Sequence, residues 1–177
     1  MAADELDPDR FRAVIGTFAT GVTIVTCHGP DGPAGLTTNA VASLSLHPLL
    51  MLVCFDRGSR TLAAARAAGR FAVNVLRAEQ EDLARVFASK RVARAKFEAV
   101  THRVRHGVPV LDDALAWVAC DLRDLHDGGD HVIAVGAVTQ MHAARDGEPL
   151  VFFRGHYARL DAAAATSSPA SAGPGTR

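Results

Sequence analysis

An amphipathic helix is predicted near the start of the chain. Its apolar residues fall at positions i, i+3, i+4 and i+7, namely Phe11, Val14, Ile15 and Phe18. Asp7 suits the N-cap, and Pro8 suits the first helical position. We expect this helix to end near Gly21, where the pattern changes.

Short runs of β-branched and other apolar residues follow, and such runs are typical of strands. The predicted strands span residues 22–27, 35–46, 49–55, 70–76, 114–126, 131–140 and 149–153. Helices are predicted over residues 61–68 and 78–89, and residues 90–113 are expected to be mostly loop and turn. About six or seven short strands in one domain favour a barrel over an open sheet. The sequence therefore predicts a mostly β fold with helices at its periphery.

Composition and charge narrow the possible functions. The chain has 177 residues, which suits one domain with a sizeable core. Lys and Arg total 19 and Asp and Glu total 19, and a chain without a basic excess is a poor candidate for binding nucleic acid or a membrane surface. No apolar run is long enough to span a bilayer. The acidic, polar N-terminal residues do not resemble a secretory signal.

The cysteines and the C-terminal residues carry further expectations. Cys27, Cys54 and Cys120 lie far apart within apolar stretches, which argues against a disulfide framework or a metal motif. We expect reduced, buried thiols in a cytoplasmic protein. Residues 162–177 contain no large apolar side chain, so we expect a disordered tail after a folded domain over residues 1–161.

Two segments could together bind a planar, phosphate-bearing ligand. The predicted strand 35–46 carries small hydroxyl and amide residues between its apolar positions, whereas the run 49–55 is apolar throughout and is expected to be buried on both faces. A strand of small polar residues allows a flat heterocycle to lie close to the backbone. The turn over residues 56–61 begins a helix, where unpaired N–H groups attract phosphate and Arg60 could clamp it. The alternative is a polar barrel strand followed by an ordinary serine N-cap.

Two more clusters of residues could bind a ligand, but their residue types indicate the kind of ligand less clearly. HDGGDH, residues 126–131, contains metal-ligand residue types, but a tight hairpin turn points their side chains in different directions, and we expect no metal. FFRGHY, residues 152–157, could frame a second ligand with aromatic faces and a guanidinium, or could simply be a closing strand with surface charges. No GxGxxG, GxSxG or HExxH motif is present, which favours a reaction that a cofactor carries.

Several blocks, taken in order, resemble the flavin reductase-like family of small NAD(P)H:flavin oxidoreductases. They are FRAVIGTFATGVTIVT, GLTTNAVASLSLHPLLMLVC, GRFAVNVL followed by Gln80 and FAS, GDH at 129–131, and PLVFFRGHY. The resemblance covers roughly residues 8–160. It implies an FMN-binding split β-barrel that works as a homodimer. Such proteins reduce FMN or FAD with NADH or NADPH, and the reduced flavin diffuses to a partner monooxygenase.

The resemblance also implies site residues. Residues 35–40 would lie along the flavin ring and ribityl chain, residues 54–56 would continue that wall, and residues 59–61 would hold the phosphate. The flavin-binding residues implied in this way are Gly35, Leu36, Thr37, Thr38, Asn39, Ala40, Cys54, Phe55, Asp56, Ser59, Arg60, Thr61, Phe87 and Ser89. His131 would be the catalytic residue at the nicotinamide. The remaining residues implied for NAD(P)H are Phe152, Phe153, Arg154, Gly155 and Tyr157.

The chain departs from the family pattern at Ala95-Lys96-Phe97, where the family commonly has Asp-Lys-Phe. Lys96 is therefore a candidate phosphate contact, but the resemblance does not predict the structure of the loop around it.

Two alternative functions are also consistent with the sequence. One is a reductase with tightly bound FMN that acts on another acceptor, such as ferric chelates. The other is a flavin-binding protein without enzymatic activity.

Overall fold

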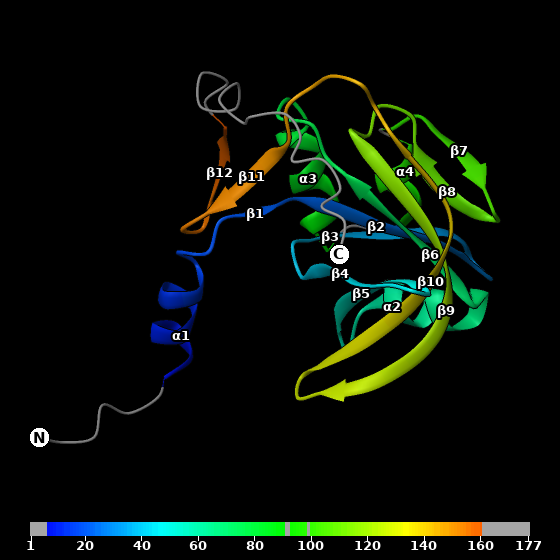
Figure 1. Ribbon diagram of the computed structural model, residues 1–177, viewed down its shortest axis with the longest axis horizontal. Coiled ribbons are helices and arrows are strands. Elements are labelled where there is room, and N and C mark those ends of the chain that lie inside the picture. Colours follow the sequence, from blue (N-terminus) through cyan, green and yellow to red (C-terminus); the bar gives the residue numbers. More distant parts are fainter. Residues whose placement is uncertain (1–6, 91–92, 99, 161–177) are drawn as a thin grey trace, which may run out of the picture.

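The computed structural model describes residues 7–90, 93–98 and 100–160 (Figure 1). Its largest sheet has seven strands in the order β3-β2-β6-β9-β10-β5-β4. These strands are β2 (Thr23–Gly29), β3 (Gly32–Thr38), β4 (Val41–Leu46), β5 (Leu49–Asp56), β6 (Arg70–Val75), β9 (Ala116–Gly128) and β10 (His131–Ala143). Two smaller sheets contain β1 (Thr20–Gly21), β11 (Leu150–Phe153) and β12 (His156–Arg159), and β7 (His102–Arg105) and β8 (Val108–Leu111).

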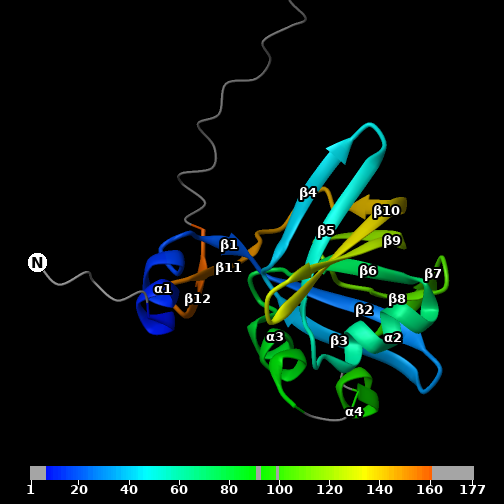
Figure 2. The ribbon, with the colours of Figure 1, turned by 90° about the horizontal axis from the view of Figure 1, so that it is seen from below.

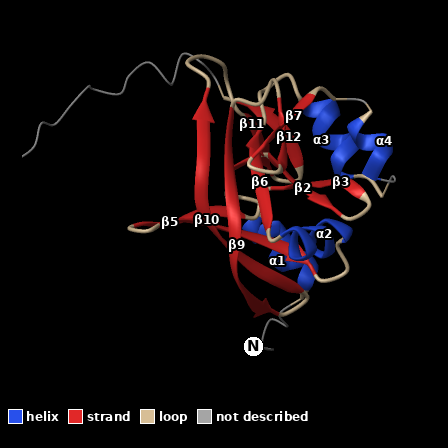
Figure 3. Cartoon of the chain, turned by 90° about the vertical axis from the view of Figure 1, so that its right-hand side faces the viewer, coloured by secondary structure: helices blue, strands red, loops and turns tan. Residues whose placement is uncertain are grey.

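The helices lie at the periphery of the strands (Figure 3). They are α1 (Pro8–Ile15), α2 (Arg60–Ala68), α3 (Glu81–Ala88) and α4 (Ala93–Phe97). The mostly β fold with peripheral helices is therefore confirmed. No helix in the described part of the chain is both long and apolar enough to cross a membrane.

The large sheet curls so that its two outermost strands, β3 and β4, come close together at one junction. Only Asn39 and Ala40 separate these two strands in the sequence. The backbone N–H of Cys54 on β5 donates to the carbonyl of Ala40 at 2.9 Å, which holds this junction against the sheet. The ladders of the described strands do not close between β3 and β4, so the curled sheet agrees with a split barrel.

We call the large sheet with α2 and α3 the body of the molecule, and α1 with β1, β11 and β12 the arm. The core of the body lies on both sides of β2 and β6. Phe55 and Phe71 meet edge to face on the side that α2 covers, with ring centroids 6.4 Å apart. Phe87 of α3 packs on the other side. β11 of the arm joins this core through Leu150, whereas α1 lies at the outer end of the arm (Figure 1).

The structure corrects the predicted boundaries of the first helix. α1 ends at Ile15 rather than near Gly21, because Gly16 caps it with an N–H that donates to the carbonyl of Arg12 at 2.9 Å. The chain then turns into β1, which pairs with β11. Phe18 therefore lies outside the helix, and no residue of α1 is buried.

Three other predictions for secondary structure were wrong. The run 49–55 is not buried on both faces, since Leu49 is 43% exposed where the β4–β5 hairpin projects from the sheet (Figure 2). Residues 35–46 form parts of two strands, not one, because the chain changes sheet edges at residues 39–40. Residues 90–113 are not mostly loop: they contain α4, β7 and β8, and Val108 and Val110 of β8 pack on the body. The predicted tail, residues 162–177, lies outside the described residues.

Candidate functional site

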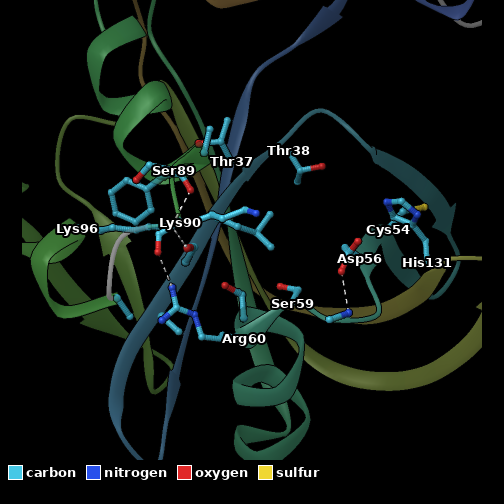
Figure 4. A pocket seen from close by; sticks show the side chains of 18 residues that line it. Thr37, Thr38, Cys54, Asp56, Ser59, Arg60, Ser89, Lys90, Lys96 and His131 are labelled. Atoms are coloured by element: carbon cyan, nitrogen blue, oxygen red, sulfur yellow. Dashed lines mark hydrogen bonds between the residues drawn. The ribbon is translucent and has the colours of Figure 1, made fainter. Parts of the chain in front are cut away.

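A pocket of about 840 Å³ lies between β3, the end of β5, the start of α2 and the end of α3 (Figure 4). The predicted site residues that line it are Gly35, Leu36, Thr37, Thr38, Cys54, Asp56, Ser59, Arg60, Thr61, Phe87, Ser89 and His131. The structure adds Ala34, Gly58, Ala88, Lys90, Ala93 and Lys96. Folding thus brings together four parts of the sequence, namely residues 34–38, 54–61, 87–96 and His131.

One end of the pocket is built on the β5–β10 ladder. His131 is paired with Asp56, and Ile133 with Cys54. Because paired residues in a sheet share a face and alternate residues point the same way, Cys54, Asp56 and His131 all face the pocket. Phe55 lies between Cys54 and Asp56 with its side chain in the core, 1% exposed. Of the predicted wall 54–56, Phe55 therefore does not line the pocket.

His131 is held by its sequence neighbour. Its Nδ1 lies 2.7 Å from an Oδ1 oxygen of Asp130, and this hydrogen bond lowers the pKa of the Asp130 carboxyl below its usual value. Since Nδ1 is engaged, Nε2 is the ring nitrogen that His131 can offer to a ligand. The adjacent Asp56 carboxylate accepts from the backbone N–H of Gly58 at 2.7 Å, which shapes the turn into α2.

The opposite end of the pocket collects positive charge. Arg60, Lys90 and Lys96 gather there, away from His131 (Figure 4). Ser59 is the N-cap of α2 and accepts from the N–H of Leu62 at 3.4 Å, so the first turn of the helix faces this end with its N–H groups. The Arg60 guanidinium donates to the carbonyl of Lys90 at 3.2 Å. A helix N-terminus beside several cations suits a phosphate.

Lys96 is the buried member of this group. It is 5% exposed, and its Nζ donates to the carbonyls of Phe87 at 2.8 Å and Gly35 at 3.4 Å. Burial, together with the nearby charge of Arg60, lowers the pKa of its ammonium group. The sequence indicated Lys96 only through the Ala-Lys-Phe departure. Its placement in the pocket comes from α4, which the sequence did not predict.

Gly35 has to be a glycine because of its surroundings. A Cβ atom there would lie 2.9 Å from the ring of Phe87 and 3.1 Å from the carbonyl oxygen of Val25. The absent side chain lets Phe87 pack directly on β3. Gly35, Thr37 and Thr38 of β3 line the pocket with small side chains, and such a wall suits a flat ring.

Five more of the predicted residues line two cavities that adjoin the pocket. Asn39, Ala40, Phe152 and Gly155 line one of about 620 Å³ that also touches Cys54. Phe152 and Tyr157, which meet edge to face at 5.5 Å, line another of about 190 Å³ together with Thr37 and Thr38. Because Cys54, Thr37 and Thr38 also line the main pocket, the three spaces adjoin one another.

Two residues of the predicted NAD(P)H set line none of these spaces. Phe153 is 38% exposed, and the Arg154 guanidinium lies over its ring at 5.2 Å from the centroid. Within one chain, therefore, Phe152, Gly155 and Tyr157 approach the wall of the pocket from the arm, whereas His131 approaches it from the β9–β10 hairpin.

The HDGGDH hairpin does not gather its acidic and histidine side chains. Arg57 donates to the Asp127 carboxylate at 3.0 Å, while Asp130 bonds His131. Within the described residues, no group of three or more His, Cys, Asp or Glu side chains could hold a metal ion. Burial raises the pKa of Cys27 and Cys120 to about 12, so both remain thiols, and only Cys54 touches the pocket.

Comparison with known proteins agrees with this geometry. The family model described as "Flavin reductase like domain" matches residues 15–161. The chain belongs to the flavin reductase-like family. One relative of this flavin reductase-like chain is the reductase subunit HsaB of a flavin-dependent monooxygenase from Rhodococcus jostii (strain RHA1). It is 40% identical over 162 residues, which cover 91% of this chain and 82% of that protein.

Solved structures share the fold. Nitrilotriacetate monooxygenase component B from Mycobacterium thermoresistibile has a TM-score of 0.86 and 37% identity, and the match covers 96% of this chain and 94% of that chain. The NADH:FAD oxidoreductase SgcE6 of Streptomyces globisporus C-1027, solved with NAD and FAD fragments, has a TM-score of 0.83 and 35% identity, with 90% and 98% covered. This flavin reductase-like chain is therefore an oxidoreductase by family.

Proposed function

We propose that this chain is the reductase component of a two-component flavin-dependent monooxygenase. It transfers a hydride from NADH or NADPH to FMN or FAD and supplies the reduced flavin to a partner monooxygenase. One observation carries the proposal: the fold joins the small residues of β3 to the anion-binding start of α2 in one pocket. A flavin needs such an arrangement, because a ribityl chain separates its flat ring from its phosphate.

The chain's own residues bind and orient both ligands. The first turn of α2, Ser59–Thr61, receives the flavin phosphate, and Arg60 neutralises it. β3 lies along the ring, with Gly35, Thr37 and Thr38 in the wall of the pocket. Backbone N–H donors near the ring favour the charge that develops on reduction.

The second ligand reaches the exposed face of the flavin ring. The flavin accepts the hydride at N5 from C4 of the nicotinamide, which requires the reacting atoms to be about 3–3.5 Å apart. His131 donates from Nε2 to the carboxamide or a phosphate of the nicotinamide nucleotide and so fixes the stacked geometry. Phe152 and Tyr157 supply an aromatic wall from the arm. The hydride step itself demands no proton from the protein.

Two further proposals concern the assembly and its location. We infer a homodimer, because the arm exposes Phe11, Val14, Ile15 and Phe18 at 52–69% of their surface and a second copy would cover them. We also propose a cytoplasmic location, which the three free cysteines support, because a reducing compartment keeps thiols unpaired.

A steady-state assay tests the proposal. Oxidation of NADH and NADPH is followed with FMN, FAD and riboflavin in turn, and the product flavin is offered to a monooxygenase. Turnover that depends on added flavin is expected. If no combination oxidises either nicotinamide nucleotide, the proposed function is wrong. A yellow colour that survives desalting would instead support the reductase with tightly bound FMN.

A further inference from the structure

A second groove begins where the phosphate end of the pocket stops. Its volume is about 510 Å³, and it runs between the turn of the β2–β3 hairpin and the outer side of α2. Ala34, Arg60 and Ala93 line both the groove and the main pocket. The groove therefore adjoins the pocket at Arg60, and it is the next space that a ligand extending past Arg60 meets.

The groove has two apolar walls that come from different elements. Pro30 and Pro33 lie on the hairpin side, and Ala63 and Ala67 lie on the α2 side. The floor is closed by direct contact, because a Cβ atom on Gly29 would lie only 2.8 Å from the Cβ of Ala64. Short side chains on both walls leave a space for a flat aromatic ring and allow its faces to leave water.

Positive charge stands at the junction of pocket and groove. The Arg60 guanidinium is held toward Lys90 by its 3.2 Å hydrogen bond to that residue's carbonyl. Lys96 adds a second charge from the buried side, since its Nζ donates to Phe87 and Gly35 beside the same end of the pocket. Two fixed cations next to the N-terminus of α2 match a diphosphate, which carries a charge on each phosphate.

We propose that the groove takes the adenosine half of FAD, with the diphosphate at Arg60, and that FAD is the preferred flavin of this chain. This rests on the proposed function, because it assumes a flavin ring in the main pocket. FMN ends at its phosphate and would leave the groove unused. The exposed carboxylate of Asp31 also lines the groove and can accept a hydrogen bond from the ribose or the adenine amino group.

NADH also carries an adenosine on a diphosphate, so the positive charge alone does not distinguish FAD from NADH as the ligand of the groove. The position of the junction favours FAD. The flavin phosphate lies at Ser59–Thr61 in the proposed function, and the groove opens directly beside it. His131 lies at the other end of the pocket, and Phe152 and Tyr157 line an adjoining cavity.

The test measures binding in the absence of NADH, by titrating the protein with FAD, FMN and riboflavin and following flavin fluorescence. The wild-type chain should bind FAD more tightly than FMN. The double variant Ala63→Leu/Ala67→Leu fills one wall of the groove with residues of good helix propensity at exposed positions, so the fold should persist. It should weaken FAD binding by at least about tenfold and change FMN binding by less than about twofold. Ala63→Ser/Ala67→Ser, which keeps the walls short, should preserve the FAD preference.

Three outcomes would overturn the proposal. One is equal affinity of the wild-type chain for FAD and FMN. Another is equal weakening of FAD and FMN in the leucine variant. The third is unchanged FAD binding with a raised KM for NADH, which would assign the groove to the nicotinamide nucleotide. Failure of the proposed function looks different: the chain would bind FAD in preference to FMN yet oxidise neither NADH nor NADPH.

Discussion

The body and the arm contain similar apolar residues in opposite environments. In the body, Phe55, Phe71 and Phe87 are at most 1% exposed, whereas in the arm Phe11 is 67% and Phe18 is 69% exposed. The arm residues Phe11, Val14 and Ile15 nevertheless have the helical spacing of a buried face. The comparison shows that periodicity tells which side of an element avoids water, but not whether the same chain supplies the cover.

The sharpest test of this comparison is truncation of one phenylalanine in each region. Phe55→Ala should lower the free energy of unfolding by about 3–5 kcal/mol, because it leaves a cavity against Phe71 in a packed core. Phe11→Ala should affect unfolding only through association, so its effect should depend on protein concentration. Urea denaturation at several protein concentrations measures both. A large loss for Phe11→Ala at every concentration would contradict the contrast.

Charge on the arm should break association without unfolding the body. Ile15→Asp/Phe18→Asp should weaken the dimer by at least about a hundredfold, since each buried apolar side chain contributes about 1.5–3 kcal/mol. Analytical ultracentrifugation at micromolar concentration measures the effect, and Ala13→Asp, also exposed on α1, is the control. A wild-type chain that sediments only as a monomer would refute the dimer.

Within the pocket, the cationic end should respond to substitution more strongly than the histidine end. Arg60→Ala should weaken FMN binding by about 1.5–3 kcal/mol, through loss of a charged hydrogen bond to phosphate. Riboflavin, which has no phosphate, is the ligand control, and Arg66→Ala in the last turn of α2 is the matched variant. Equal weakening of riboflavin and FMN would remove Arg60 from the phosphate site.

The smallest effect is expected at His131. His131→Ala should lower kcat/KM for NADH about tenfold, which corresponds to about 1.4 kcal/mol, and should change flavin affinity little. Stopped-flow reduction at saturating flavin separates hydride transfer from NADH binding. If neither the transfer rate nor the NADH affinity changes, His131 only flanks the hairpin turn.

Local signals in the sequence were enough for many elements of the body. The predicted helix over residues 61–68 is α2, which begins after the N-cap Ser59 and ends at the left-handed Gly69. The predicted hairpin turn at residues 126–131 joins β9 to β10. Local signals failed at residues 90–113, where β8 is short and contains Pro109, so that no alternation marks it as a strand. Its burial against Ala72 and Ala119 depends on residues distant in the sequence.

The candidate site also has some features that short segments predict and others that only packing decides. The sequence by itself determined the residue types that suit a flavin: small side chains along residues 35–40 and an N-capped helix start at residues 59–61. These are properties of short segments, set by backbone freedom and by the N–H groups that a helix leaves unpaired. Only the tertiary structure decided that Phe55 faces the core, that Lys96 reaches the pocket from α4, and that Phe153 lies outside it. Which face a side chain takes depends on strand register and on what packs against it, and neither is encoded within a short segment.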